Sequence, residues 1–219
     1  DEPGGGVHMI LTRSYLNPRR RDARKLLASP QAMHAAIRSG FPPNADPGRV
    51  LWRMDAEGPS ATVWIVSADT PDLTHLEEQA GWPSRSTTKS IAYGGLLRAL
   101  DVDQAWAFRL TANPTHRAQH NGKKKVFAHV TAEQQTQWLL DRQEQLGVKL
   151  HTGAETPTFT LVGRDTKRFR RGQSTVTLGV APFSGALEVV DPDLLRTALT
   201  SGVGRGKAYG CGLLTLARP

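Results

Sequence analysis

Three polar side chains share one face of a predicted helix early in the chain. Gln31, His34 and Arg38 are spaced by three and four residues, which places them together on a helix surface. Met33 and Ile37 fall on a different face, where apolar side chains pack into a core. The sequence therefore aligns a hydrogen-bonding amide, a titratable imidazole and a permanent cation.

This set of groups suits cleavage of RNA without a metal, because the substrate brings its own nucleophile. A base takes the proton of the ribose 2′-OH, an acid protonates the leaving 5′-oxygen, and cations stabilise the charge on the phosphorane. Arg38 is expected to lower the pKa of His34 and to leave more of its base form at neutral pH. The spacing also fits an ordinary surface histidine on a basic helix, and spacing alone does not separate the two interpretations.

A second basic feature is a predicted hairpin at residues 163–172, with the sequence GRDTKRFRRG. Its one aromatic side chain, Phe169, is surrounded by five cations. They are Arg164, Lys167, Arg168, Arg170 and Arg171. A two-stranded basic ribbon can enter a groove of a nucleic acid, so the favoured interpretation is polyanion binding. The alternative is a mobile surface hairpin.

Two further clusters of cations are candidate phosphate contacts. They occur in PRRRDARK at residues 18–25 and in GKKK at residues 122–125. Neutralising the phosphate backbone dominates the affinity of nucleic-acid binding and makes it sensitive to salt. The side chains expected to make these contacts are Arg21, Arg24, Lys25 and Lys123.

Residues 202–214 have the sequence GVGRGKAYGCGLL, with five glycines beside two cations. The stretch is not a P-loop, because Lys207 is followed by alanine, and not a Rossmann turn, because no helix or acidic residue follows. Unobstructed backbone N–H groups at Gly204 and Gly206, with Arg205 and Lys207 beside them, can approach phosphates. A helix C-cap that leads through a glycine turn to an edge strand fits the sequence equally well.

No metal site and no small-molecule cofactor are predicted. His116 and His120 are four residues apart but have no neighbouring cysteine or carboxylate, so we interpret them as loop residues. Cys211 is the only cysteine and has no local histidine partner, which argues against a thiol nucleophile.

The tryptophans are interpreted mainly as core residues. Those at apolar positions of predicted elements are Trp52, Trp64, Trp106 and Trp138. The aromatic side chains with which RRM proteins stack bases are not evident on the predicted central strands. This argues against binding of single strands on an open sheet and for recognition of a hairpin by its shape.

The chain of 219 residues carries 28 Lys and Arg against 20 Asp and Glu, a net charge of +8. Residues 1–113 contain 13 basic and 12 acidic side chains, whereas residues 114–219 contain 15 and 8. The excess of positive charge in the second half favours a polyanionic partner. No apolar run approaches the roughly 20 residues of a membrane-spanning helix. With a single cysteine and no signal peptide, we expect a cytoplasmic protein without membrane contact.

The predicted elements repeat the order strand, helix, strand, strand, helix, strand. In the first half they are residues 9–16, 20–39, 49–55, 61–68, 70–80 and 105–114, and residues 89–93 stay unassigned. In the second half they are residues 124–130, 131–147, 156–171, 174–190, 191–202 and 211–217. Two tandem ferredoxin-like (RRM-like, split βαβ) units account for this order and give an α+β fold. The predicted domains are residues 9–113 and 114–219, after a foreign leader at residues 1–8.

Two helices have clear boundary signals. The first is expected to break at Ser29, a good N-cap, with Pro30 at the first position of the next helix. The helix at residues 131–147 is expected to begin after Thr131 and to stop at Gly147.

The chain resembles the CasE (Cse3) family, endoribonucleases of the repeat-associated mysterious protein superfamily that process CRISPR precursor RNA in type I-E systems. The resemblance runs from Met9 almost to the last residue. It rests on LNPRRRDARKLLASPQAMHAAI, LWRMD, FRLTANP, the helix around QWLLDRQEQLG and GALEVVDPDLLRTALTSGVGRGKAYGCGLLTLA. The last of these is the most specific, because a glycine-rich loop at the end of a second ferredoxin-like unit is the hallmark of that superfamily.

This resemblance implies a metal-independent endoribonuclease that binds the stem-loop of each CRISPR repeat. The implied enzyme cuts at the 3′ base of the stem by 2′-OH attack, leaves a 2′,3′-cyclic phosphate and a 5′-hydroxyl, and retains its product. By position, the family's catalytic histidine falls on His34, and its groove-inserting hairpin and glycine loop fall on residues 164–171 and 202–212. The implied protein partners are other subunits of the type I-E surveillance complex.

One departure from the family concerns the residue three positions before that histidine. Some members have a tyrosine there, whereas this chain has Gln31, whose amide can hydrogen-bond RNA but cannot exchange a proton near neutral pH. Whether His34 acts as base, as acid or as both in turn stays open, with Arg38 or a lysine carrying more of the charge stabilisation. The alternatives to an enzyme are a non-catalytic subunit that binds the RNA hairpin and a scaffold subunit of the complex.

Overall fold

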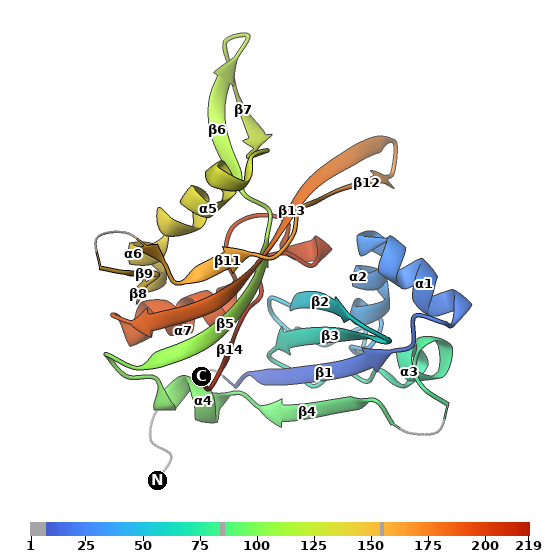
Figure 1. Ribbon diagram of the computed structural model, residues 1–219. Helices are drawn as coiled ribbons and strands as arrows, with labels where there is room; N and C mark the ends of the chain where they lie inside the picture. Colours follow the sequence, from blue (N-terminus) through green and yellow to red (C-terminus); the bar gives the residue numbers. More distant parts are fainter. Residues whose placement is uncertain (1–7, 84–85, 154–155) are drawn as a thin grey trace. The chain divides into compact units, whose positions relative to one another are not determined.

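A computed structural model of the chain describes residues 8–83, 86–153 and 156–219 (Figure 1). The chain forms two units, residues 1–99 with 208–210 and residues 100–207 with 211–219. Each unit has an antiparallel sheet and helices, which confirms the predicted α+β class. The predicted leader lies outside the described residues except for His8.

The first unit has the predicted order of elements, with its first helix split in two. The elements are β1 (Ile10–Leu16), α1 (Arg21–Ala28), α2 (Pro30–Arg38), β2 (Leu51–Glu57), β3 (Ser60–Ser67), α3 (Thr74–Ala80), β4 (Thr88–Ala92) and α4 (Gly94–Ala99). β1 lies between β3 and β4, and β2 pairs with the other edge of β3, all antiparallel. Element order and strand pairing together make this a ferredoxin-like unit.

The predicted boundary between the domains is wrong. The first unit ends its sheet with β4, in the segment that sequence analysis left unassigned, and the chain enters the second unit between Ala99 and Leu100. The strand predicted at residues 105–114 is β5 (Ala105–Ala112), which pairs with strands of the second sheet. Alternating residues fit either sheet equally, so only the pairing assigns this strand to a unit.

Ser29 and Pro30 separate α1 from α2 as predicted. The Ser29 hydroxyl accepts a hydrogen bond from the Ala32 N–H at 3.2 Å, and Pro30 takes the first helical position, where no N–H is needed. Because of the break, each short helix turns its own apolar side to the core. α1 buries Ala23, and α2 buries Met33 as well as Ile37.

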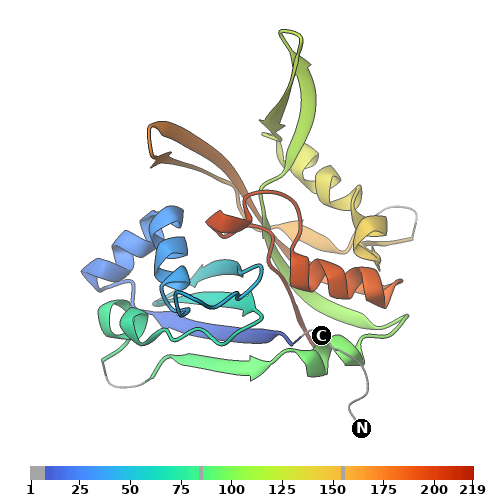
Figure 2. The ribbon, with the colours of Figure 1, turned by 180° about the vertical axis from the view of Figure 1, so that it is seen from behind.

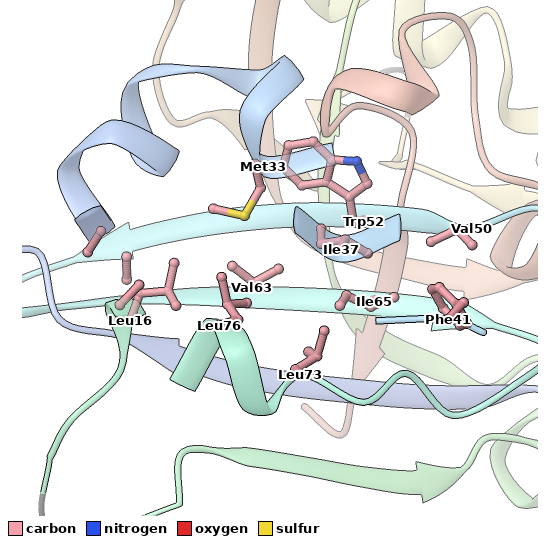
Figure 3. Packing of buried hydrophobic residues seen from close by; sticks show 13 residues of the cluster. Leu16, Met33, Ile37, Phe41, Val50, Trp52, Val63, Ile65, Leu73 and Leu76 are labelled. Atoms are coloured by element: carbon pink, nitrogen blue, oxygen red, sulfur yellow. The ribbon is translucent and has the colours of Figure 1, made fainter. Parts of the chain in front are cut away.

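The core of the first unit lies between its helices and one face of its sheet (Figure 3). Met33 and Ile37 of α2 pack in the same cluster as Trp52 of β2. Val63 of β3 and Leu76 of α3 belong to it too, and all five are at most 2% exposed. Strand side chains alternate between the faces, so the residues between these buried positions point to the opposite side of the sheet.

The second unit repeats the ferredoxin-like order with additional strands. Its elements are β5, β6 (Thr115–His120), β7 (Lys123–Ala128), α5 (Ala132–Leu140), α6 (Gln143–Leu146), β8 (Val148–Lys149), β9 (His151–Thr152), β10 (Thr156–Pro157), β11 (Phe159–Leu161), β12 (Asp165–Arg171), β13 (Ser174–Val189), α7 (Pro192–Ser201) and β14 (Leu214–Ala217). The 3-10 turn η1 (Lys207–Tyr209) begins in this unit, and its other two residues belong to the first. β5 lies between β13 and β14, and β11 pairs with the other edge of β13, all antiparallel. No helix in the described ranges is long and apolar enough to cross a bilayer.

Two hairpins are added to this ferredoxin-like core. β6 and β7 pair with each other in the connection between β5 and α5. β12 pairs with the N-terminal half of β13, a strand of 16 residues, and the resulting ribbon extends beyond the sheet (Figure 1, Figure 2). The hairpin predicted at residues 163–172 is therefore confirmed.

The helix predicted at residues 131–147 is in fact two helices, α5 and α6. Its start is as predicted, because the Thr131 hydroxyl accepts from the Gln134 N–H at 3.1 Å in a capping box. The helical hydrogen bonding is interrupted after Leu140, and the Arg142 side chain donates to the Trp138 carbonyl at 2.7 Å. This contact satisfies one of the open carbonyls at the end of α5. Gly147 follows α6 with a φ of +67°, as a stop signal should.

Packing of α2 predicts a large loss of stability for Met33→Ala. The side chain is fully buried, so its removal leaves a cavity and is expected to cost about 2–5 kcal/mol in the free energy of unfolding. Gln31→Ala on the exposed side of the same helix is the control, with an expected change within about 0.5 kcal/mol. Urea unfolding followed by circular dichroism measures both, and equal costs would contradict the packing described.

Candidate functional site

The outward side of α2 carries the predicted catalytic residues. Gln31 and Arg38 are exposed and His34 is half-buried, whereas Met33 and Ile37 are fully buried. The helix therefore divides into a polar and an apolar side as its spacing predicted. What Gln31, His34 and Arg38 do chemically stays a prediction.

The imidazole of His34 lies in a partly apolar, positively charged environment. Its Nδ1 atom is buried and has no hydrogen-bond partner among the described residues. Burial lowers the pKa of His34 below its ordinary value, and the positive charge of Arg38 lowers it further. The predicted direction agrees, although burial, which spacing does not reveal, is the larger cause. A neutral imidazole near pH 7 is able to accept a proton.

The cations of α1 are only partly available for phosphate. Lys25 donates to the Asp22 carboxylate at 2.9 Å, three residues back on the same helix, and this contact lowers the pKa of Asp22. Arg24 donates to the Arg19 carbonyl at 2.7 Å. Arg21 is exposed on the first turn of the helix. All three predicted contacts lie at the surface, and exposed pairs of this kind exchange readily for a stronger anion.

The basic hairpin divides its cations between two sides of the ribbon. Arg168 and Arg170 are exposed and face the same side, where they lie opposite Thr177 and Thr175 of β13. Lys167 is half-buried on the other side, which it shares with Phe169.

The remaining predicted phosphate contacts on the two hairpins lie at the ends of strands. Arg164 precedes β12 and donates to the Val130 carbonyl at 3.1 Å. The side chain of Arg171 lies outside the described residues. Lys123 is exposed at the start of β7, next to a turn at Asn121 and Gly122 with φ values of +51° and +71°. Positive φ at both turn positions is typical of a tight two-residue hairpin.

The glycine-rich loop ends α7 and leads to the edge strand β14. Gly202 follows the helix with a φ of +76°, and Gly204 and Gly206 adopt φ values of +71° and +82°. Lys207 donates its ammonium to the Ser201 carbonyl at 2.7 Å, so this cation stabilises the helix end. The loop therefore has the geometry of a helix C-cap, as one of the two interpretations predicted. Lys207 takes part in this cap, and Arg205 is the exposed cation of residues 202–207.

The backbone of this loop is open to an anion. Among the described residues, the N–H groups of Gly204, Arg205 and Gly206 have no backbone hydrogen-bond acceptor. Successive N–H groups around left-handed glycines form a concave surface that binds anions. The predicted phosphate-binding backbone thus remains compatible with the cap.

Comparison with known proteins bears on the whole chain. A family model described as CRISPR associated protein matches residues 9–218. The chain belongs to this family of CRISPR-associated proteins. It is 35% identical to the CRISPR-associated endoribonuclease Cse3 of Thermus thermophilus over 220 residues, 95% of this chain and 100% of that protein. The predicted resemblance to the Cse3 family is confirmed.

Solved structures of CRISPR-associated proteins agree with the fold. A structure of Thermus thermophilus Cse3 bound to an RNA that represents a pre-cleavage complex matches with a TM-score of 0.79. It is 33% identical, and the match covers 96% of this chain and 99% of that one. Cas6e of Escherichia coli K-12 matches with a TM-score of 0.65 and 19% identity, over 96% of this chain and 100% of that one. At that identity the second likeness shows the fold alone.

This CRISPR-associated protein has an aromatic pair that sequence analysis missed. Tyr15 on β1 and Trp64 on β3 are half-buried on the sheet face opposite the helices. The Arg13 guanidinium lies over both rings, 4.6 Å from the Tyr15 ring centroid and 6.0 Å from that of Trp64. The interpretation of Trp64 as a core residue is therefore wrong. The central strands β1 and β3 do carry aromatic side chains, which were not evident from the sequence. Alternation from the buried Val63 was the signal that could have revealed this face.

Two interpretations of reactive side chains can be compared with the structure. His116 and His120 are not loop residues but lie on β6. The ring centroid of His116 is 4.7 Å from that of His129. Within the described ranges, no three His, Cys, Asp or Glu side chains group as metal ligands. Burial raises the pKa of the Cys211 thiol to about 12, which agrees with the prediction that it is no nucleophile.

The pKa of His34 should respond to Arg38 in a predictable direction. In an NMR titration, the imidazole is expected to titrate below the ordinary value of about 6.5, and Arg38→Met should raise its pKa. Because burial remains in the variant, the pKa should not fully recover. Arg49→Met, at an exposed position of the same unit, is the control. A His34 pKa that is unchanged by Arg38→Met would contradict the electrostatic assignment.

Proposed function

We propose that this chain is a metal-independent endoribonuclease that cuts CRISPR repeat RNA at the 3′ base of its stem-loop. The observation that carries the proposal is the full-length relation, at 35% identity, to a protein named CRISPR-associated endoribonuclease. The half-buried His34 on the outward side of α2 adds a group whose lowered pKa favours the neutral form, which can accept a proton.

In the proposed reaction, the neutral His34 takes the proton of the ribose 2′-OH. The 2′-oxygen attacks the adjacent phosphorus, the bond from phosphorus to the 5′-oxygen breaks, and a 2′,3′-cyclic phosphate forms. The leaving 5′-oxygen takes up a proton and becomes a hydroxyl, and the resulting imidazolium of His34 is one source of that proton. Arg38 stabilises negative charge on the phosphorane. Gln31 positions the ribose or phosphate by hydrogen bonding, because its amide cannot exchange a proton.

Binding of the RNA is assigned to the basic ribbons and the glycine-rich loop. Arg168 and Arg170 enter a groove of the stem, and phosphates contact the loop backbone and Arg205. The other predicted contacts are Arg21, Arg24, Lys25, Lys123, Arg164, Lys167, Arg171, Gly204, Gly206 and Lys207. Lys167 and Lys207 are expected to contribute least, because one is half-buried and the other caps α7.

The proposed enzyme works in the cytoplasm without a cofactor. It keeps the product stem-loop bound and joins other subunits of a type I-E surveillance complex. The retained product and the complex are implied by the family resemblance, whereas the location and the lack of a cofactor were predicted from composition and motifs.

A second candidate function is a non-catalytic subunit that binds the RNA hairpin. Two observations favour it. Gln31 occupies a position where some family members have a tyrosine. Tyr15 and Trp64 lie on the sheet face opposite the helices, the face on which RRM-type sheets stack bases. Tight binding of repeat RNA without any cleavage would select this candidate over the enzyme.

Replacement of His34 tests the proposed chemistry. His34→Ala is expected to lower the single-turnover rate of repeat-RNA cleavage by about 10²–10⁴-fold, because general base catalysis is lost. Wild type should cut at an unchanged rate in the presence of a chelator. His151→Ala in the second unit is the control and should keep the wild-type rate. Cleavage that survives His34→Ala, or that needs a divalent ion, would overturn the mechanism.

The exposed side of the basic hairpin should carry much of the RNA affinity. In a His34→Ala background, which keeps the RNA intact, Arg168→Gln and Arg170→Gln should each weaken binding of the repeat hairpin. Each should also reduce the slope of log K against log salt by about 1, because one phosphate or groove contact is lost. Arg218→Gln, exposed in the same unit, is the matched control. Affinities equal to this control would remove the hairpin from the RNA-binding surface.

A further inference from the structure

A cavity of about 540 Å³ opens in the second unit beside the glycine-rich loop. Its walls come from the β6–β7 hairpin, the end of α5 and the loop after α7. Among its lining residues are His116, His129, Trp138, Arg142, Gly204 and Arg205. Pockets of several hundred Å³ are large enough to hold one small ligand.

Arg142 is a half-buried cation that lies over an aromatic ring. Its guanidinium carbon is 3.9 Å from the centroid of the Trp138 ring, and one nitrogen donates to the Trp138 carbonyl at 2.7 Å. The neighbouring Asp141 accepts from the Gln137 amide at 2.8 Å, and Arg142 has no ion pair within the described ranges. The Asp141 carboxylate also lines the cavity and favours the charged form of Arg142, but burial is the larger effect and lowers the pKa of Arg142. A bound anion would offset the cost of this desolvation.

Two imidazoles, those of His116 and His129, also line the cavity. The rings of His116 and His129 lie 4.7 Å apart, and Nδ1 of His129 is buried without a hydrogen-bond partner in the described part of the chain. Burial, with His116 and Arg142 nearby, lowers the pKa of His129. The neutral ring has one donor and one acceptor nitrogen, which is what a base edge or a ribose hydroxyl needs.

The glycine-rich loop forms one wall of the cavity with its backbone. Gly204 has a φ of +71°, and a Cβ atom at this position would lie 2.9 Å from the Trp138 ring. Any side chain there would therefore disturb both the backbone and the floor of the cavity. The N–H groups of Gly204 and Arg205 face no backbone acceptor in the described structure, and the Arg205 side chain adds a second cation.

We propose that this cavity binds one unstacked nucleotide of the RNA, with the phosphate between Arg142 and Arg205. Guanidinium planes and imidazoles stack on splayed bases, and backbone N–H groups at glycines take phosphate oxygens. The residues that define this subsite, His116, His129 and Arg142, lie outside all basic segments singled out from the sequence. The proposal rests on the proposed function in that RNA is the ligand, but the subsite binds and does not cut.

The test compares RNA affinity between matched arginine variants of the full chain. In the His34→Ala background, Arg142→Gln should weaken binding of the repeat hairpin with its single-stranded flanks by about tenfold. The salt slope should fall by about 1, whereas Arg218→Gln should change neither quantity. Arg142→Lys keeps the charge but loses the planar fork, so an intermediate loss is expected. Thermal unfolding of each variant verifies that the fold is intact.

Two further measurements distinguish binding of RNA from binding of a free nucleotide, and binding from cleavage. Adenosine monophosphate and inorganic phosphate, titrated into wild type and Arg142→Gln by calorimetry, should bind far more weakly than the RNA. The single-turnover cleavage rate of wild type at saturating RNA is measured alongside. This rate reports the proposed function separately from the subsite.

The proposal is overturned if Arg142→Gln and Arg142→Lys bind the RNA as tightly as the Arg218→Gln control. Loss of adenosine monophosphate binding in Arg142→Gln with unchanged RNA affinity would assign the cavity to a free nucleotide and would overturn it too. If wild type cuts no RNA, the proposed function fails, yet the affinity comparison still decides whether the cavity contacts RNA.

Discussion

Burial of Met33 and Ile37 against the sheet is the contact on which the proposed active site depends. Because these side chains lie four residues apart on α2, their packing fixes the rotation of the helix, and Gln31, His34 and Arg38 must lie on its other sides. The His34 ring is half-buried, and burial is the main cause of its lowered pKa. The hydrophobic contact therefore sets the side of the helix from which the imidazole projects.

A second constraint is the alternation of side chains along a strand. It divides the cations of β12 between two sides, so Arg168 and Arg170 face solvent together while Lys167 shares a side with Phe169. The number of cations in the segment therefore overstates the charge that one RNA groove can meet. In the glycine-rich loop, likewise, Lys207 stabilises the end of α7, and binding of phosphate falls to the backbone and to Arg205.

Local signals in the sequence predicted the features that depend on neighbouring residues. The break at Ser29, the capping box at Thr131 and the basic hairpin are of this kind. Features that depend on distant pairing could not be predicted. β5 alternates in the same way whichever sheet it joins, and the contact of His116 with His129 arises only when the β6–β7 hairpin forms. Helical spacing and the family resemblance both pointed to His34, but no spacing rule shows how deeply its ring is buried.

The chemistry of the new RNA ends tests the account most directly. Repeat RNA is incubated with the full chain in the presence of a chelator, and mass spectrometry identifies both ends at the cut. Attack by the 2′-OH predicts a 2′,3′-cyclic phosphate on one fragment and a 5′-hydroxyl on the other, with no product when the ribose at the cut is 2′-deoxy. A 3′-hydroxyl with a 5′-phosphate, or cleavage of the 2′-deoxy substrate, would contradict the account.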